Sequence, residues 1–480
     1  MKKKPVILEN ITVEDYAAEG KSLAHANGKV IFIENTIPGD IVDVQLYKNK
    51  KDWAEGWPLN FKSYSSERVL PFCAHFGVCG GCQWQMLPYE KQLYYKQKQV
   101  GDNLKYIGKM PLPPLMPIIG CDNSKYYRNK IEYTFSDKKF VPEDEFRILR
   151  EQGVSYEEIG NESVAGFHAK GVFDKVVDID ICHLQAEPSN EIRKAVAAFA
   201  CENHFSFYDM KEHFGWLRNM TVRMTTTGEL MLNIVFGYEH EKSRKQLLDF
   251  ILNKFPMITT LLYVINPKPN DSIFDLAPQV YFGKGHITEK LSTGSGEEDF
   301  EFRISPKSFF QTNTKQAEKL YQVVRNFAEL DGTKVVYDLY CGTGSIGIFV
   351  SRGAKKIIGI DVIKEAIDDA KENAMLNNIS HASFFAGDVT GICTDEFFAM
   401  NGKPDVVITD PPRAGMHQKL VLKLMEIAAP VIVYVSCNPA TQARDLSLLS
   451  EKYTVEKIQP LDMFPHTHHI ENIAQLKLKV

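Results

Sequence analysis

The 480-residue sequence lacks any apolar run close to the roughly 20 residues that a membrane-spanning helix needs. Its start, MKKKPVILENITVED, is basic but turns acidic without an apolar core, which excludes a signal peptide. No internal repeat is visible. We therefore expect a soluble, cytoplasmic protein that does not contact a membrane.

The chain also lacks a strong excess of charge. Its formal net charge of −5 gives no overall attraction for nucleic acid, although it leaves room for a local basic face. The nine cysteines are an odd number, and disulfides are rare in the cytosol, so metal binding or catalysis is their expected use. The length allows two to four domains with apolar cores.

Turn residues divide residues 6–66 into short strand patterns. About five strands in such a segment predict a small barrel of the OB type, although any small β-barrel gives the same pattern. One lysine-rich stretch carries aromatic residues, which suits a nucleic-acid surface but is also typical of a solvated hairpin tip. Its residues are Tyr47, Lys48, Lys50, Lys51 and Trp53.

Three domains are expected along the chain: a barrel over 1–66, a central α+β domain over 67–300 and a C-terminal domain over 301–480. A helix with a lysine-rich face is predicted for 89–109, and the acidic stretch 141–164 is interpreted as a surface insertion. Strands and helices alternate regularly in 301–480, which predicts an α/β fold with a doubly wound parallel sheet.

A glycine-rich turn follows a predicted strand in KVVYDLYCGTGSIGIF, residues 334–349. Gly342 and Gly344 begin a GxGxxG pattern, which by itself is a weak sign of a dinucleotide site. Asp338 precedes the glycines, and its carboxylate would repel a pyrophosphate but suit a cationic ligand. S-adenosylmethionine carries a sulfonium and an ammonium group, so the pattern favours it over NAD.

Acidic residues end the next three predicted strands as well. Asp361 is placed to accept hydrogen bonds from ribose hydroxyls, and Asp388 to accept one from an adenine amino group. Asp410 ends the following strand, in DVVITDPPR. One such aspartate is usually a helix cap, but four in succession at the carboxyl edge of a parallel sheet indicate a ligand site.

The motif Asp410-Pro-Pro-Arg413 and the stretch VIVYVSCNPATQARDL, residues 431–446, indicate the chemistry. Enzymes that methylate amino groups of bases typically have an aromatic residue where Arg413 stands. Cys437 ends a predicted buried strand on the donor edge. Carbon 5 of a pyrimidine attacks a methyl sulfonium only after a thiolate has added to carbon 6, so Cys437 is the expected nucleophile.

A covalent mechanism of this kind also needs a base to remove the carbon 5 proton. Glu471, just before the last predicted strand, is the preferred candidate. The neighbouring His466, His468 and His469 are alternative bases; their spacing does not match known zinc motifs, and we interpret them as RNA or phosphate contacts.

Together, DLYCGTG, DPPR, VSCNPAT and HHIEN resemble the uracil-5-methyltransferases of RNA, over nearly the whole chain. The resemblance implies a class I, Rossmann-like methyltransferase domain with Cys437 as nucleophile and Glu471 as base. The segment SFFQTN resembles the one whose glutamine contacts the donor, here Gln311. By the same match, Tyr340, Asp361 and Asp410 line the donor site.

Cys73, Cys79 and Cys82 have the spacing C-x5-C-x2-C, and Cys182 lies far downstream. This set can hold zinc, with His75 or His183 as a further ligand, or an iron–sulfur cluster, and spacing does not decide between them. The resemblance implies a [4Fe-4S] cluster, as in the ribosomal members of the family. It also implies that the barrel is a TRAM domain.

The resemblance therefore favours 23S ribosomal RNA as substrate, because members that act on transfer RNA commonly lack both the cysteines and the barrel. A tRNA uracil-5-methyltransferase is the alternative within the enzyme class. A non-catalytic iron–sulfur RNA-binding protein is the alternative from another class, but such a protein would be expected to lose Cys437 or Glu471. We expect a monomer.

Overall fold

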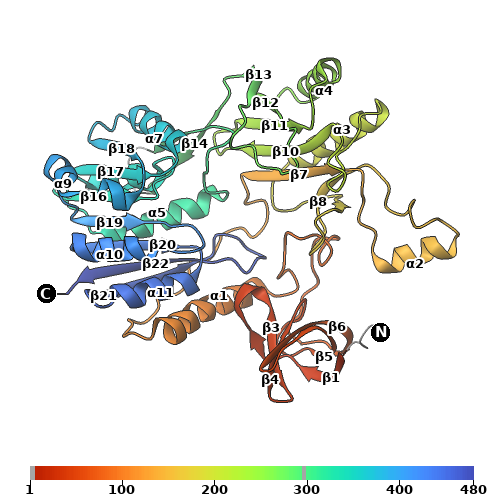
Figure 1. Cartoon of the computed structure of the whole chain (residues 1–480), viewed down its shortest axis with the longest axis horizontal. Coiled ribbons are helices and arrows are strands. Elements are labelled where there is room, and N and C mark those ends of the chain that lie inside the picture. The colour runs from red at the N-terminus through yellow and green to blue at the C-terminus, as the bar shows by residue number, and fades with distance from the viewer. Residues whose placement is uncertain (1–5, 295–298, 480) are drawn as a thin grey trace.

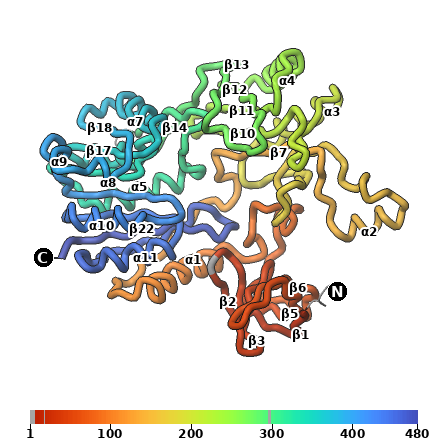
Figure 2. The backbone as a smooth tube through the Cα atoms, in the orientation of Figure 1, coloured from red at the N-terminus to blue at the C-terminus, as the bar shows by residue number. Residues whose placement is uncertain are grey.

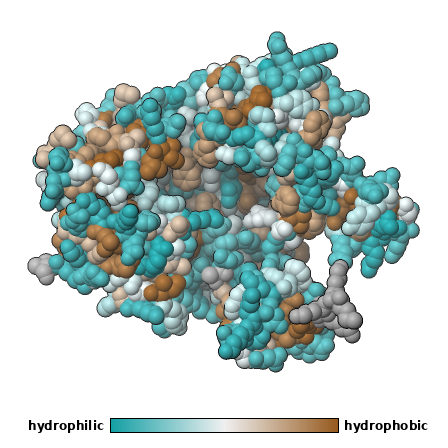
Figure 3. Space-filling model, in the orientation of Figure 1, coloured by the Kyte–Doolittle hydropathy of each residue, from teal (hydrophilic) through white to brown (hydrophobic). Residues whose placement is uncertain are grey.

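The computed structural model describes residues 6–294 and 299–479, which form three units, each built on its own sheet (Figure 1). The surface is hollowed where the three units meet (Figure 3). No helix in these two ranges is long and apolar enough to cross a membrane.

The N-terminal unit is a six-stranded sheet in the order β1-β5-β6-β4-β3-β2 that curls around a small apolar core. Alternating side chains such as Ile31 and Ile33 point inward, as the period of a half-buried strand requires. The predicted barrel is confirmed, with six strands rather than five. The strands are β1 Val6–Thr12, β2 Asp15–Tyr16, β3 Ser22–Ala26, β4 Lys29–Ile33, β5 Ile41–Asn49 and β6 Trp53–Ser63.

The central unit is a seven-stranded sheet in the order β13-β12-β11-β10-β7-β8-β9, with helices α3 and α4 packed together against it. Strand β11 is buried along its whole length because both faces of the sheet are covered there. Its elements are β7 Lys130–Ser136, β8 Val164–His168, β9 Val176–Asp178, α3 Ser189–Glu202, β10 Leu217–Met224, β11 Leu230–Phe236, α4 Glu241–Lys254, β12 Thr260–Ile265 and β13 Gln279–Gly283.

The acidic stretch 141–164 leaves this unit as an arm carrying helix α2 (Glu143–Glu151), which has no buried residue (Figure 1). Phe146 and Tyr156 pack edge to face within the arm, with ring centroids 5.3 Å apart. The structure therefore agrees with a surface insertion.

The C-terminal unit has the sheet order β18-β17-β16-β19-β20-β22-β21. The first five strands are parallel, as predicted, but β22 runs antiparallel to both β20 and β21. The strands are β16 Val335–Leu339, β17 Lys356–Asp361, β18 Ala382–Ala386, β19 Val406–Thr409, β20 Val431–Ser436, β21 Tyr453–Leu461 and β22 Glu471–Leu478.

Helices cover both faces of this sheet, and the hairpin β14–β15 shares its apolar core. The predicted boundary between residues 300 and 301 therefore falls inside a strand that packs with the C-terminal unit. The remaining elements are β14 Ile287–Leu291, β15 Phe300–Ile304, α5 Thr314–Ala328, α6 Ser345–Val350, α7 Lys364–Leu376, α8 Val389–Ile392, α9 Asp395–Asn401, α10 Gln418–Ile427 and α11 Pro439–Leu449.

The predicted helix over 89–109 is present as α1 (Tyr89–Asn103) and a π-helical turn, Leu104–Gly108. It packs against α11 and β21 of the C-terminal unit rather than within the central one. Figure 2 shows α1 beside α11. Its lysine-rich face is not entirely solvated, because Lys96 is fully buried and its Nζ lies 2.6 Å from Asp462 Oδ1.

We predict that Lys96→Met lowers the free energy of unfolding by about 3–5 kcal/mol, because it leaves the Asp462 carboxylate buried without its cation. Chemical denaturation followed by far-UV circular dichroism measures the change. Lys98→Met is the matched control on the same helix: its pairs with Asp15 and Asp102 are partly exposed, so the expected loss is about 0–1 kcal/mol. Equal losses for the two variants would contradict the prediction.

Candidate active site

Cys437 follows the last residue of β20 directly, and Glu471 is the first residue of β22. The two strands pair antiparallel with Ser436 opposite Asn472, so Cys437 and Glu471 stand opposite each other one step further along. Opposite residues of an antiparallel pair have Cα atoms about 4.5–5.5 Å apart and side chains on the same face. The thiol and the carboxyl are therefore neighbours at one edge of the sheet.

The chain fixes the thiol where it leaves the strand. Asn438 caps α11, since its side chain accepts a hydrogen bond from Ala440 N at 3.1 Å, and Pro439 occupies the first helical turn, where a missing N–H does no harm. The Asn438 side chain also donates to Arg413 O at 3.1 Å. The Asp410–Arg413 motif and the cysteine turn are thus held together.

Burial and negative neighbours dominate the electrostatics around the thiol. Burial, followed by the charges of Glu471 and Asp410, raises the pKa of Cys437 to about 11. Burial and Asp410 raise the pKa of Glu471 well above its usual value, and burial raises that of Asp410 to about 7. Arg413 acts in the opposite direction on Cys437 and Glu471. The Arg413 side chain is exposed to solvent.

The glycine-rich turn has the backbone shape that a close approach to a ligand requires. Gly342 and Gly344 have φ of +52° and +79°, and Tyr340 is also left-handed at +60°, which is uncommon for a residue with a side chain. Gly342 N donates to Asp361 Oδ2 at 2.9 Å. The end of β17 therefore holds the turn that follows β16.

Asp338 lies beneath this turn and is fully buried. Its Oδ2 accepts a hydrogen bond from Gly347 N at 2.9 Å, whereas Oδ1 has no hydrogen-bond partner among the described residues. Burial raises the pKa of Asp338 to about 7, and the charges of Asp410 and Asp361 add to the effect. A cationic ligand at this edge would offset the repulsion among these carboxylates.

A cavity of about 370 Å³ opens beside the turn. It brings together Tyr340, Asp361 and Asp388, three of the predicted donor residues, with apolar side chains such as Ile360 and Leu420. A nucleoside fits such a cavity, because the carboxylates can accept hydrogen bonds from its hydroxyl and amino groups and the apolar side chains can pack against its base.

Asp388 also serves as the helix cap that a strand-end aspartate commonly is. Its carboxylate accepts hydrogen bonds from Thr390 N at 2.9 Å and from the Thr390 hydroxyl, and the hydroxyl bond is the main reason that its pKa is lowered. Asp361 likewise accepts Ile363 N at 2.9 Å. Both carboxylates are therefore oriented by the chain before any ligand binds.

Gln311 lies outside this cavity, in the loop before α5. The N-terminal end of α5 is fastened to the loop that leads to Glu471: Asn313 Nδ2 donates to Met463 O at 2.9 Å, and Gln316 Nε2 to Asp462 O at 2.6 Å. The segment that carries Gln311 therefore leads into the part of α5 that is bonded to the loop before Glu471.

The histidines of that loop do not form one group. His466 is buried with its ring Nδ1 3.1 Å from Gln92 Nε2, so interpreting it as an RNA contact is wrong. His468 and His469 are partly exposed. Burial lowers the pKa of His466 and His468 to about 4 and that of His469 to about 3, so all three are neutral near pH 7 and offer no charge to a phosphate.

The four cysteines Cys73, Cys79, Cys82 and Cys182 line a second cavity, of about 310 Å³. They are not drawn together as ligands of a single ion, since no group of three or more His, Cys, Asp or Glu side chains in the described ranges has the geometry for one. His75 Nε2 accepts Asp180 N at 2.9 Å, which does not favour it as a zinc ligand. Burial raises the pKa of Cys79 to about 11 and of Cys82 to about 12.

Besides Thr390, sequence reasoning missed two polar residues of the cavity beside the glycine turn, His417 and Lys419. They begin α10, and His417 caps this helix by accepting Lys419 N at 3.2 Å. Residues 414–416 separate His417 from the DPPR motif and show no distinctive pattern. The only signal in the sequence for these two residues is that they follow the DPPR motif closely.

Comparison with known proteins identifies the molecule. Residues 276–479 match the family model tRNA (Uracil-5-)-methyltransferase, and residues 8–59 match the TRAM domain. A protein of Bacteroides thetaiotaomicron named "Uncharacterized RNA methyltransferase" is 50% identical over 466 residues, 96% of this chain and 100% of that protein. The chain belongs to the RNA uracil-5-methyltransferase family.

Other relatives agree. A Porphyromonas gingivalis protein of the same name is 44% identical, covering 97% of this chain and 98% of that protein. The crystal structure of Pyrococcus abyssi tRNA (uracil-54, C5)-methyltransferase with S-adenosyl-L-homocysteine has a TM-score of 0.73 and 29% identity, covering 97% of this chain and 100% of that one. The chain is thus an S-adenosylmethionine-dependent RNA uracil-5-methyltransferase with a TRAM domain.

We predict that alkylation of Cys437 by iodoacetamide increases with pH toward a midpoint near its pKa of about 11. Only the thiolate reacts, and the negative charge of Glu471 disfavours the thiolate. Glu471→Gln removes that charge, so the midpoint should move to lower pH. Peptide mass spectrometry at Cys437 measures the rate, and Glu456→Gln, an exposed change on β21, is the control. An unmoved midpoint in Glu471→Gln would show that the two groups do not interact.

Proposed function

We propose that this methyltransferase acts through a covalent adduct between Cys437 and the target uracil, with Glu471 as base. The Cys437 sulfur bonds to carbon 6, and the electron pair of the C5–C6 double bond attacks the donor's methyl group, leaving S-adenosylhomocysteine. The Glu471 carboxylate then takes the carbon 5 proton, the double bond forms again, and the thiolate leaves. The observation that supports this most directly is the strand register that puts the two residues opposite each other.

The same geometry supports roles for the neighbouring residues. We assign the nucleoside of the donor to Tyr340, Asp361 and Asp388, and its cationic end to the edge near Asp410, with Gln311 as a further contact. Gly342 leaves room for the donor, since no atom lies within 4 Å of a Cβ built there, whereas Gly344 packs against Ala370, Phe384 and Ile348 and is assigned to the site through its backbone. The Arg413 guanidinium favours the thiolate of Cys437 and the carboxylate of Glu471, because it lowers the pKa of both.

The RNA substrate we propose is 23S ribosomal RNA, acted on by a single chain. The four-cysteine cavity supports this proposal through its likeness to the ribosomal members of the family. Transfer RNA is the second candidate, because the Pyrococcus abyssi enzyme acts on tRNA and matches 97% of this chain. That coverage means that the barrel and central unit do not by themselves separate the two substrates. Either RNA must turn the uridine out of its stack to reach Cys437.

A [4Fe-4S] cluster is our proposal for the cysteine cavity. Four cysteines around one space of about 310 Å³ provide the thiolate set that such a cluster takes. Burial raises the pKa of Cys79, Cys82 and Cys182, so these three thiols ionise more readily beside a cation. When bound, the cluster would supply cross-links between the segment 73–82 and Cys182 rather than reaction chemistry.

We predict that Glu471→Gln accumulates a protein–RNA adduct that survives denaturing electrophoresis, because methyl transfer precedes the proton removal that this variant lacks. Cys437→Ala should form neither adduct nor 5-methyluridine, while Cys201→Ala and Glu456→Gln, which change exposed residues, should behave as the native enzyme. Measurable 5-methyluridine from Cys437→Ala would overturn the nucleophile assignment.

The same adduct identifies the substrate. Glu471→Gln incubated with total RNA, followed by sequencing of the trapped RNA, should recover a site in 23S ribosomal RNA. Recovery of transfer RNA instead would establish the second candidate.

We also predict that protein purified without oxygen is brown and holds about four irons per chain, the content of one four-thiolate cluster. Cys79→Ser should lose the colour and the iron, as measured by absorption and metal analysis. Cys201→Ser, which changes an exposed cysteine outside the cavity, should keep both. A colourless native protein with one zinc per chain would refute the cluster.

A further inference from the structure

The segment 308–313, which precedes α5 and carries Gln311, is attached to the central sheet. Asn129 N donates to Thr312 O at 2.8 Å, and Asn129 Nδ2 donates to Gln311 O at 2.9 Å. A further bond joins Arg223 Nη2, at the end of β10, to Ser308 O at 3.3 Å. Residues of the central unit therefore hold the segment that carries Gln311, the donor contact proposed above.

The side-chain amide of Asn129 has a defined orientation. A backbone carbonyl only accepts, so the nitrogen of the amide and not its oxygen faces Gln311 O. The second amide hydrogen goes to Thr314 Oγ1, at 2.9 Å. The backbone of Asn129 is bonded to β10, because the backbone carbonyl of Asn129 accepts a hydrogen bond from Met224 N at 2.8 Å.

The hydroxyl of Thr314 continues this chain of hydrogen bonds. It has one proton, which it donates to Glu289 Oε2 at 2.8 Å, and it therefore accepts from Asn129. The other oxygen of Glu289 accepts from Thr226 N at 2.9 Å and from the Thr226 hydroxyl. Glu289 is fully buried, and Thr314 is 3% exposed.

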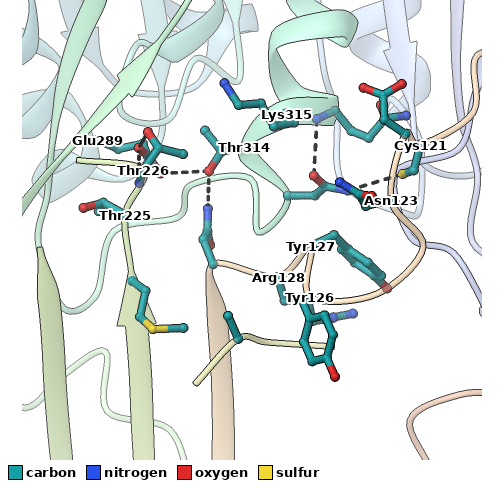
Figure 4. A pocket seen from close by; sticks show the side chains of 16 residues that line it. Cys121, Asn123, Tyr126, Tyr127, Arg128, Thr225, Thr226, Glu289, Thr314 and Lys315 are labelled. Atoms are coloured by element: carbon teal, nitrogen blue, oxygen red, sulfur yellow. Dashed lines mark hydrogen bonds between the residues drawn. The ribbon is translucent and has the colours of Figure 1, made fainter. Parts of the chain in front are cut away.

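Figure 4 shows Glu289, Thr226 and Thr314 meeting at one wall of a cavity of about 260 Å³, with strands of the central sheet on one side and α5 on the other. In this network each group acts only as a donor or only as an acceptor toward a given neighbour, so the directions of the hydrogen bonds are fixed. Buried networks that are fully satisfied make a site rigid.

We infer that Asn129 is a positioning residue for the methyl donor. Acting through its two amide hydrogens, it sets the place of Gln311, so the donor site is completed by the central unit and not by the C-terminal sheet alone. This inference rests on the proposed donor role of Gln311. It assigns a function to Asn129 and Thr314 that does not require either side chain to touch the donor or the RNA.

The isosteric change Asn129→Asp tests it, because a carboxylate cannot donate to Gln311 O or to Thr314. We expect the dissociation constant for S-adenosylhomocysteine, measured by calorimetry, to rise at least tenfold, and KM for the donor to rise while KM for RNA stays unchanged. Asn123→Asp is the matched control: Asn123 is exposed, lines the same cavity and receives the same added charge. Its donor affinity should be native.

A second pair of variants covers the case in which Asn129→Asp folds poorly. Thr314→Val removes the hydroxyl at nearly constant volume and should weaken donor binding, whereas Thr314→Ser keeps the hydroxyl and should restore it. A purely structural role would lower the melting temperature without changing the dissociation constant of the folded protein.

The double variant Asn129→Asp/Gln311→Ala tests whether Asn129 affects donor binding through Gln311. If Asn129 acts through Gln311, the double variant binds donor no more weakly than Gln311→Ala alone, since the interaction is already lost. Fully additive losses would overturn the inference, and so would native affinity in both Asn129→Asp and Thr314→Val. Native donor affinity in Gln311→Ala would overturn both the donor role of Gln311 and the inference. Weakened affinity in Gln311→Ala with native affinity in the other variants would overturn the inference alone.

Discussion

The buried ion pair between Lys96 and Asp462 fixes α1, the helix that follows the barrel and the cysteine segment, against the C-terminal unit. Both side chains are fully buried, and burial lowers the pKa of Lys96. The second carboxylate oxygen of Asp462 accepts Tyr89 Oη–H at 2.8 Å, and its backbone carbonyl accepts Gln316 Nε2. Because separating the pair leaves a charge without a partner in the interior, α1, α5 and the end of β21 are held at one point. The barrel and the cysteine segment precede α1, so they are tethered there too.

Asp462 is also the first residue of the loop that leads from β21 to Glu471, so the ion pair fixes one end of that loop. Asp338, Asp410 and Glu471 lie at the same edge of the sheet, and burial raises the pKa of each. Such an edge favours a donor that carries positive charge. Methyl transfer removes the sulfonium charge, so the same carboxylates attract the product less strongly than the donor, and the electrostatic preference that binds the donor also favours product release.

The sequence predicts the parts of the molecule whose cause is local. The parallel strands, the glycine turn and the strand-end residues follow from apolar runs and from the rule that ligands bind at the carboxyl edge, and the structure has them there. Cys437 and Glu471 could be named but not placed opposite each other, since that follows from the antiparallel insertion of β22, which periodicity does not reveal. The sequence predicts a helix with a lysine-rich face but not the burial of Lys96, because a partner 366 residues away leaves no trace in the local pattern.

Residues that join separate units were the hardest to predict, for the same physical reason. Asn129 and His466 lie in loops, where a polar side chain usually means solvent, yet each is bonded to a segment far along the chain. The carboxyl edge of the parallel sheet, together with the start of α10, forms the cavity beside the glycine turn, and the same edge carries Cys437. The segments that close the site, 308–313 and 462–470, take their positions from the central unit and from α1. The TRAM domain leads through the chain to α1, whose Lys96 binds Asp462 and Phe464 O of segment 462–470, so the RNA-binding domain has a direct structural link to the end of the sheet that carries Cys437 and Glu471.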